Sequence, residues 1–252
     1  MFDDLVSVFS EMHKCGIMLA LYALFWKEII MIFTEIPFRE IFAKPFVLKY
    51  DASKLFDGLD NISWPEEADA VLCYSYYDIE LGERGSGLSF DILAPMQFDT
   101  GFVYQDMSPF LVGGARLLIR SGQYEACEVY CFAKESEDRI REAYATQCAL
   151  DDSYWCCDKD VVELFNIEEI DHLRYLTNPL DVQVYLFGGS QGTELVWMQL
   201  IKKNEDGTFQ ARLLNMPYGL CGCVPGDVMQ VSLFEGDDGV TGLFTRADAD
   251  TE

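Results

Sequence analysis

Hydrophobic and polar positions alternate through the last third of the chain, a pattern typical of strands with one buried face. Four runs follow this two-residue period: Val182–Phe187, Leu195–Ile201, Phe209–Leu214 and Val228–Leu233. Between the second and third runs, Asn204–Gly207 predicts a tight turn, because glycine accepts the positive φ that such turns need. The sequence therefore predicts an antiparallel β module over residues 181–245.

Strands are also expected earlier in the chain, where β-branched and aromatic residues concentrate between Gly and Pro. These strands are Pro45–Tyr50, Ala70–Leu81, Leu88–Leu93 closed by Pro95, and Glu125–Ala133. The Gly82–Gly87 loop lacks the Lys-Ser/Thr of a phosphate-binding loop and does not precede a helix. A β-hairpin connection is therefore the better interpretation of this loop.

Two helical regions are expected between these groups of strands. Ser136 predicts an N-cap for a helix that runs to about Leu150, with a buried side made of Ile140, Ala143, Tyr144 and Leu150. The second region covers Asp160–Leu176, where Asp160-x-x-Glu163 is similar to a capping box and Asn178-Pro179 ends the helix. The expected fold class is α+β, with a mixed strand and helix region over residues 31–180 before the β module.

A continuous apolar run from Cys15 to Trp26 dominates the N-terminal segment, residues 1–30. These 12 residues are too few to span a bilayer, and Lys27-Glu28 interrupts any longer apolar stretch. A membrane-spanning segment is therefore not predicted. Three interpretations stay open: a helix packed on the body, a membrane-surface anchor, or a segment that is not translated because the chain starts at Met31. The third is slightly favoured, since Lys27–Met31 can be encoded by a ribosome-binding sequence followed by a start codon.

Pro179 marks the expected junction between the mixed region and the β module. No flexible linker separates the two regions, so a single compact unit with one shared core is the alternative. Residues 246–252 are expected to form an acidic tail, and the sequence sets no oligomeric state.

Acidic residues outnumber basic ones by 43 to 18, which gives a formal net charge of -25 at pH 7. Such a field repels phosphate backbones, so no nucleic acid partner is expected, whereas a cationic protein partner would be attracted. The residues nominated for the acidic partner surface are Asp151, Asp152, Asp158, Asp160, Asp237 and Asp238. The plainer interpretation is that the charge confers only solubility.

The 9 cysteines are an odd number, and neither Cys156-Cys157 nor Cys221-Gly-Cys223 suits a disulfide framework. Without a convincing export signal, we expect reduced thiols in a cytoplasmic protein. Structural zinc commonly takes two close pairs of ligands, whereas His13 and His172 lie far apart in the sequence. No metal and no cofactor are predicted.

The alternative function is a hydrolase or transferase with a cysteine nucleophile. Cys221 or Cys223 lies in a glycine-bounded turn where a thiol can be exposed, and His172 would serve as its base. Nothing in the sequence brings a thiol and His172 within hydrogen-bond reach. No catalytic residue is therefore predicted, and a binding protein is favoured over an enzyme.

Residues Glu194–Leu233 resemble a small bacterial β domain of unknown function that occurs in YegJ-like proteins and is related to a class of toxin-immunity domains. The matching features are the Trp197 strand, the polar turn after it, the Leu213–Pro217 run and the Gly226-Asp227 turn. The family often continues into an Asp-Trp element, which the following segment lacks. The resemblance covers about forty of the 252 residues and implies a compact, strongly bent antiparallel sheet, but no chemistry.

Together these features predict an acidic bacterial protein of the cytoplasm with a binding or regulatory function. The most specific version of this prediction is an immunity-type factor that neutralises a cationic toxin.

Overall fold

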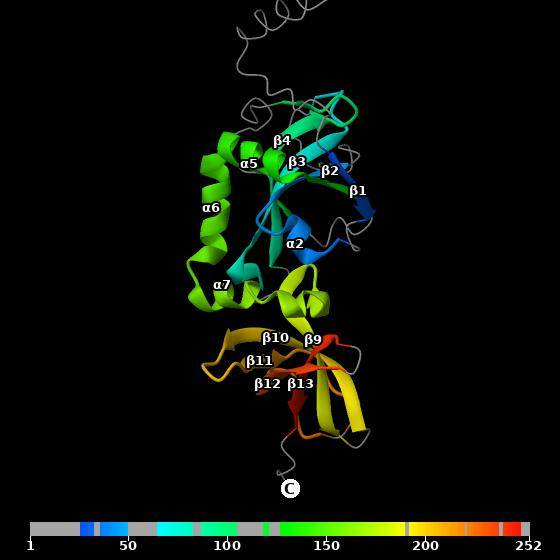
Figure 1. Ribbon diagram of the computed structural model, residues 1–252, viewed down its shortest axis with the longest axis vertical. Coiled ribbons are helices and arrows are strands. Elements are labelled where there is room, and N and C mark those ends of the chain that lie inside the picture. The colour runs from blue at the N-terminus through cyan, green and yellow to red at the C-terminus, as the bar shows by residue number, and fades with distance from the viewer. Residues whose placement is uncertain are drawn as a thin grey trace, which may run out of the picture. The chain divides into compact units, whose positions relative to one another are not determined.

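The computed structural model describes residues 26–32, 36–49, 65–82, 87–104, 118–120, 127–189, 192–219, 221–236 and 239–247 (Figure 1). Helices and extensive antiparallel sheets make up this part of the chain, which agrees with the expected α+β class. Contacts group the chain into two compact units, each assembled from separate stretches of sequence. Unit 1 comprises Met1–Ile36, Glu40–Tyr76 and Ser89–Asp151, and unit 2 comprises Pro37–Arg39, Tyr77–Leu88 and Asp152–Glu252. The expected junction at Pro179 stays a prediction.

Unit 1 contains a curled sheet with the strand order β1-β7-β2-β3-β4-β5, and β6 also pairs with β4. The strands are β1 (Trp26–Ile32), β2 (Pro45–Lys49), β3 (Ala70–Tyr77), β4 (Leu88–Gln97), β5 (Phe102–Val103), β6 (Leu118–Arg120) and β7 (Glu128–Phe132). Every residue of β3 is buried, which explains why its sequence is apolar and aromatic at every position except Ser75 and does not alternate.

Two boundaries in this sheet differ from the sequence prediction. Pro95 does not end its strand, because proline lacks only the N–H donor and its carbonyl still accepts a hydrogen bond from Tyr104 N at 2.9 Å. The strand that was expected to reach Leu81 ends at Tyr77 and is followed by the short helix α4 (Ile79–Gly82). The expected start at Met31 falls inside β1, and residues 1–25 lie outside the described residues.

The helices α5 (Lys134–Ala143) and α6 (Ala145–Cys156) follow β7 directly, and the short helix α2 (Phe38–Ile41) precedes β2. Ile140, Tyr144 and Cys148 recur every four residues and join the core of the sheet. Ala143 and Leu150 were wrongly expected in this buried row, and both are exposed. Ser136 is not the N-cap, because the helix already begins after Ala133, whose carbonyl accepts hydrogen bonds from the next turn.

Unit 2 contains a closed β-barrel (Figure 1). Its strands are β9 (Asn178–Gly189), β10 (Gly192–Lys203), β11 (Phe209–Leu213), β12 (Val228–Glu235) and β13 (Thr241–Arg246), and the two-residue strand β8 (Arg174–Tyr175) pairs with β9. Each barrel strand pairs antiparallel with the next, and β13 closes the ring by pairing in parallel with β9. The closing pair is parallel because the first and fifth of five alternating strands run in the same direction. The closing strand β13 was not predicted.

Because of the alternating pattern, every second side chain of a barrel strand points into the barrel, and most of these side chains are apolar. The interior residues, each no more than 1% exposed, are Val182, Val184, Leu186, Val196, Met198, Leu200, Phe209, Ala211, Leu213, Val231 and Leu243. Burial of a large aliphatic or aromatic side chain stabilises a fold by about 1.5–3 kcal/mol. Gly207 has a φ of 84°, so the positive φ expected in the turn between β10 and β11 is confirmed.

The helix α7 (Lys159–Phe165) and the 3-10 helix η4 (Glu168–Leu173) contact β10, β9 and β13. Asp158 caps α7, because its Oδ1 accepts hydrogen bonds from Asp160 N at 2.9 Å and Val161 N at 3.1 Å. The cap had been expected at Asp160. The helical region expected over Asp160–Leu176, with a restart or a continuation at Asn166–Glu169, is divided: α7 ends at Phe165 and η4 follows it.

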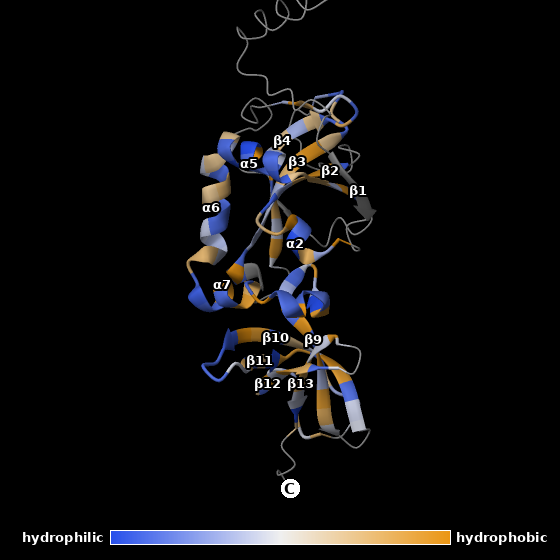
Figure 2. Ribbon diagram, in the orientation of Figure 1, coloured by the Kyte–Doolittle hydropathy of each residue, from blue (hydrophilic) through white to orange (hydrophobic). Residues whose placement is uncertain are grey.

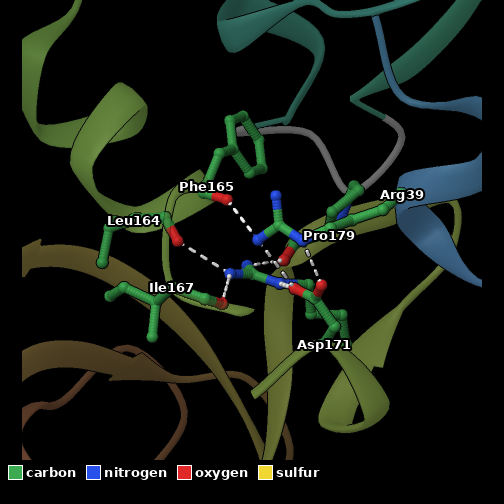
Figure 3. A network of polar contacts seen from close by, with 7 residues as sticks. Arg39, Leu164, Phe165, Ile167, Asp171 and Pro179 are labelled. Carbon is green, nitrogen blue, oxygen red and sulfur yellow. Dashed lines mark hydrogen bonds and ion pairs between the residues drawn. The ribbon is translucent and has the colours of Figure 1, made fainter. Parts of the chain in front are cut away.

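This early helix end is explained by a group of polar contacts around Arg174, which we call the Arg174 network (Figure 3). The side chain of Arg174 is 0% exposed. Its guanidinium donates to the carbonyl oxygens of Leu164 at 2.7 Å, Ile167 at 3.2 Å and Pro179 at 2.7 Å. Its Nε donates to Asp171 Oδ1 at 2.9 Å. One side chain therefore joins the C-terminal end of α7, the helix η4 and the start of β9.

A second arginine completes the Arg174 network. Arg39 donates to the carboxylate of Asp171 and to the carbonyl oxygen of Phe165, the latter at 2.6 Å. The Arg174 guanidinium also lies over two rings, 5.4 Å from the centroid of Phe38 and 5.8 Å from that of Phe165. Burial lowers the pKa of Arg174, while its hydrogen bond to Asp171 acts in the opposite direction. Each of the three guanidinium nitrogens of Arg174 thus donates at least one hydrogen bond.

We expect Arg174→Lys to lower the free energy of unfolding by about 3 kcal/mol, because an ammonium cannot reach three carbonyls and a carboxylate in the planar geometry of a guanidinium. Arg212→Lys is the matched control, since Arg212 is exposed on β11 and its change should stay within about 0.5 kcal/mol. Urea unfolding followed by circular dichroism measures both. Equal stability of the two variants would contradict the importance of the Arg174 network.

Candidate functional site

The outer surface of the barrel carries a group of large apolar side chains, which we call the aromatic face. It consists of Tyr175, Tyr185, Phe187, Leu195, Trp197, Phe234 and Phe244. Figure 2 shows hydrophobic stretches along both β9 and β10, the two strands that supply most of these residues. Because the interior takes the even-numbered positions of both strands, the odd-numbered positions point outward.

The strand register brings the members of the aromatic face together. Leu195 of β10 is paired with Tyr185 of β9, and Tyr185 is paired in turn with Phe244 of β13. Tyr185 and Leu195 remain 40% and 50% exposed, respectively. Phe187 is also 40% exposed, so the apolar surface extends toward the far end of the β9–β10 hairpin.

Four rings of the aromatic face form a chain of edge-to-face contacts. Tyr185 contacts Phe234 at a centroid distance of 5.8 Å, Phe234 contacts Phe244 at 6.0 Å, and Phe244 contacts Phe187 at 6.1 Å. Tyr175 and Trp197 form a separate pair at 5.6 Å. Aromatic rings prefer this geometry because the positive edge of one ring faces the negative face of the other. The exposed rings are therefore held in place by one another.

Gly242 fixes the position of one of these rings. A Cβ atom at Gly242 would lie 2.3 Å from Cε1 of Phe234, so the ring packs directly against the backbone of β13. Any side chain at residue 242 would displace Phe234 and disturb its contacts with Tyr185 and Phe244. The arrangement of rings in the aromatic face therefore requires glycine at residue 242.

The loop between β11 and β12, residues 214–227, is fastened to β10 beside the aromatic face. Trp197 N donates to Asn215 Oδ1 at 2.7 Å, and Leu214 N donates to the carbonyl oxygen of Trp197 at 2.9 Å. The carboxylate of Glu194 accepts hydrogen bonds from the N–H groups of Tyr218 and Gly219. Tyr218 itself is 95% exposed.

The aspartates predicted to form an acidic partner surface differ in their exposure. Asp151 is buried, so its inclusion in a partner surface is wrong, because a helix face that packs against a core does not meet solvent. Asp152 is half-buried, Asp158 is occupied in capping α7, and Asp160 is exposed. Asp237 and Asp238 lie outside the described residues. Three further carboxylates that were not predicted for this surface, those of Glu163, Glu168 and Glu169, are exposed on α7 and η4.

His172 and the two cysteines of the Cys-Gly-Cys segment do not form a catalytic pair in the described residues. His172 is exposed on η4, and no hydrogen bond joins it to Cys221 or Cys223. The two cysteines instead contact each other, with a distance of 3.2 Å between their Sγ atoms. Burial, followed by the hydrogen bond with Cys221, raises the pKa of Cys223 to about 12. A raised pKa keeps this thiol protonated and opposes a role as an activated nucleophile.

Other site chemistry is limited in the described part of the chain. No group of three or more His, Cys, Asp or Glu side chains there is close enough to hold a metal ion. The cysteines within these ranges are all free thiols, and Cys73, Cys131 and Cys148 are buried. None of the helices there combines the length and apolar character that crossing a membrane requires.

Asp181 is an unexpected buried carboxyl near the start of β9, paired in register with Gln199. Its Oδ1 has no hydrogen-bond partner. Burial raises the pKa of Asp181 to about 6, although hydrogen bonds with Asn178 and Gln199 act in the opposite direction. The ionised form of this carboxyl is therefore less favourable in the folded protein than in the unfolded chain.

The sign of the resulting pH dependence follows from linkage. An aspartate in an unfolded chain has a pKa of about 3.9, so the folded protein binds more protons between about pH 4 and pH 6. Its contribution to stability consequently falls as the pH rises through this window. Asp181→Asn should raise the free energy of unfolding by about 2 kcal/mol at pH 7.5 and leave it nearly unchanged at pH 4.

Asp206→Asn is the control with the opposite sign. Hydrogen bonds from Thr208 lower the pKa of Asp206, so its ionised form favours the folded state and this contribution is lost as the pH falls. Asp206→Asn should therefore destabilise the protein at pH 7.5. Chemical unfolding at several pH values measures both variants, and a parallel response of the two would refute the assignment for Asp181.

The barrel provides structural roles for the residues on which the family resemblance depends. Asn215 binds the backbone of Trp197, and Asp227 Oδ2 accepts a hydrogen bond from Val224 N at 2.8 Å in the turn before β12. Comparison of the chain with protein-family models, with curated proteins and with solved structures finds no match. The resemblance of Glu194–Leu233 to YegJ-like proteins and toxin-immunity domains stays a prediction.

Proposed function

We propose that this chain is a binding protein that engages a cationic protein partner through the aromatic face of its barrel. The observation that carries the proposal is the contiguity of Tyr185, Phe187 and Leu195, which are each at least 40% exposed and border the partly buried rings of Phe234 and Phe244. Single exposed apolar residues are ordinary, whereas a contiguous apolar surface on a rigid element is characteristic of a binding site.

The composition of the aromatic face suits recognition of a protein. Tyr and Trp are enriched among the residues that dominate binding energy, because they bury a large area and lose few degrees of freedom. The rings are already held by edge-to-face contacts and by packing against Gly242. Binding of a partner therefore costs little side-chain conformational entropy. Each of the five barrel strands pairs with a neighbour on both sides, which favours recognition through side chains over addition of a strand.

The charge of the chain supports the cationic character of the partner. A net charge of -25 repels a second copy of the same chain and accelerates encounter with a basic protein. Exposed Asp160, Glu163, Glu168 and Glu169 place part of this charge on α7 and η4, in the same unit as the barrel. Neutralisation of a basic toxin by an immunity-type factor is the specific form that we propose, in a cytoplasmic bacterial protein.

The alternative, a hydrolase or transferase with Cys221 or Cys223 as the nucleophile, has less support. The pKa of Cys223 is raised, and the exposed His172 makes no hydrogen bond with either thiol. A nucleophile and its base need to lie within hydrogen-bond distance.

A direct test replaces two exposed residues of the aromatic face, in the variant Tyr185→Ser/Leu195→Ser. Val228→Ser is the control, since Val228 is 53% exposed on β12 but does not belong to the aromatic face. The immobilised full chain is incubated with lysate of its source cells at about 0.05 and 0.5 M salt, and bound proteins are identified by mass spectrometry. We expect a basic protein that the wild type and Val228→Ser retain at low salt and release at high salt, and that the double variant binds at least tenfold more weakly.

Two outcomes would contradict this proposal. The first is a set of bound proteins that the double variant retains as well as the control does. The second is a self-association of the chain, seen by sedimentation velocity, that Tyr185→Ser/Leu195→Ser abolishes, because the aromatic face would then be an interface between copies. Unfolding curves of both variants establish that the substitutions leave the fold intact.

A further inference from the structure

The Cys-Gly-Cys segment in the loop between β11 and β12 brings two thiols together on a surface loop. The Sγ atoms of Cys221 and Cys223 lie 3.2 Å apart, whereas a disulfide bond measures about 2.0 Å. Closing this gap requires a shift of only about 1.2 Å between the two atoms. Both cysteines are half-buried residues, in contrast to the buried Cys73, Cys131 and Cys148.

The backbone between the cysteines makes this approach possible. Gly222 has a φ of 76°, in the left-handed region that favours glycine, and it turns the two flanking side chains toward the same side. Both ends of the loop are held, since Asn215 and Glu194 bind its first half and Asp227 Oδ2 binds Val224 N directly after Cys223. The pair of thiols is thus presented by a fixed turn.

We propose that Cys221 and Cys223 form a dithiol site that exchanges with disulfides of small thiols or of proteins. The thiolate of Cys221 attacks one sulfur of a substrate disulfide R–S–S–R, which breaks the S–S bond and releases R–S⁻, protonated by solvent to R–SH. The thiol of Cys223 then loses its proton, attacks Sγ of Cys221 in the mixed disulfide and releases the second R–SH. The protein dithiol is oxidised by two electrons to an intramolecular disulfide, and the substrate is reduced to two thiols.

The geometry gives the two thiols different roles. The Sγ of Cys223 donates a hydrogen bond to Sγ of Cys221, so the shared proton belongs to Cys223 and Cys221 is the acceptor. The raised pKa of Cys223 agrees with this direction of the hydrogen bond, since it keeps the proton on Cys223 until the mixed disulfide has formed. Cys221 is therefore the attacking thiol and Cys223 is the resolving thiol.

This site is independent of the aromatic face and of its proposed cationic partner. Cys156 and Cys157 provide an internal comparison, because they are adjacent in the sequence and both are exposed at the end of α6. If exposure alone governed exchange, the Cys156-Cys157 pair would react first. If the geometry of the Cys-Gly-Cys turn governs it, Cys221 and Cys223 form the intramolecular disulfide first.

The experiment incubates the full chain with buffers of oxidised and reduced glutathione at fixed ratios, followed by alkylation of free thiols and peptide mapping. In the wild type we expect an intramolecular Cys221–Cys223 disulfide at a lower proportion of oxidised glutathione than any modification of Cys156 or Cys157. Cys223→Ser should accumulate a mixed disulfide between Cys221 and glutathione. In Cys221→Ser, the remaining Cys223 should react about tenfold more slowly than Cys221 does in Cys223→Ser.

A further variant tests the turn itself. Gly222→Ala places a side chain at a positive φ, so it should slow the second step and allow the mixed disulfide to be detected. The proposal would be overturned if Cys221 and Cys223 stayed open to alkylation while Cys156 and Cys157 were oxidised. Equal rates of mixed-disulfide formation in Cys221→Ser and Cys223→Ser would likewise exclude the two assigned roles.

Discussion

The fold of unit 2 depends on one buried cation. Arg174 donates to the carbonyl oxygens of Leu164 at the end of α7 and of Pro179 at the start of β9, and a hydrogen bond from a charged group contributes about 1.5–3 kcal/mol. The charge itself is tolerated because Asp171 and two aromatic rings surround it. The helices α7 and η4 are thereby fixed against the strands that begin the barrel.

The barrel in turn determines where the candidate binding surface lies. Its interior is filled by the alternate aliphatic positions of β9 and β10. The residues between them have to face outward, and on three neighbouring strands these residues are Leu195, Tyr185 and Phe244. The aromatic face is thus a consequence of register: a shift of one residue in β9 would turn Tyr185 inward and Val184 outward.

The strongest sequence signals concerned local periodicity, and these gave the barrel strands β9 to β12 and the positive φ of Gly207. Features set by distant contacts were missed. The helix boundary at Phe165 depends on Arg174 and Arg39, which are remote from one another in the sequence. The edge-to-face chain of rings requires the strand order of the barrel, and the proximity of the two thiols requires the φ of Gly222. Net charge predicted an acidic protein but not which carboxylates reach the surface, as buried Asp151 and exposed Glu168 illustrate.

The parallel pairing of β13 with β9 has a consequence for how the protein is made. Phe244 is matched with Tyr185, so the two strands that complete the ring are separated by about sixty residues of chain. Contacts of such long separation form late and slowly in folding. During synthesis β9 has to wait for Thr241–Arg246 to leave the ribosome, and until then its unoccupied side is open to pairing with other chains. The barrel therefore closes only when its last strand becomes available, and the nascent chain is most vulnerable to aggregation just before that step.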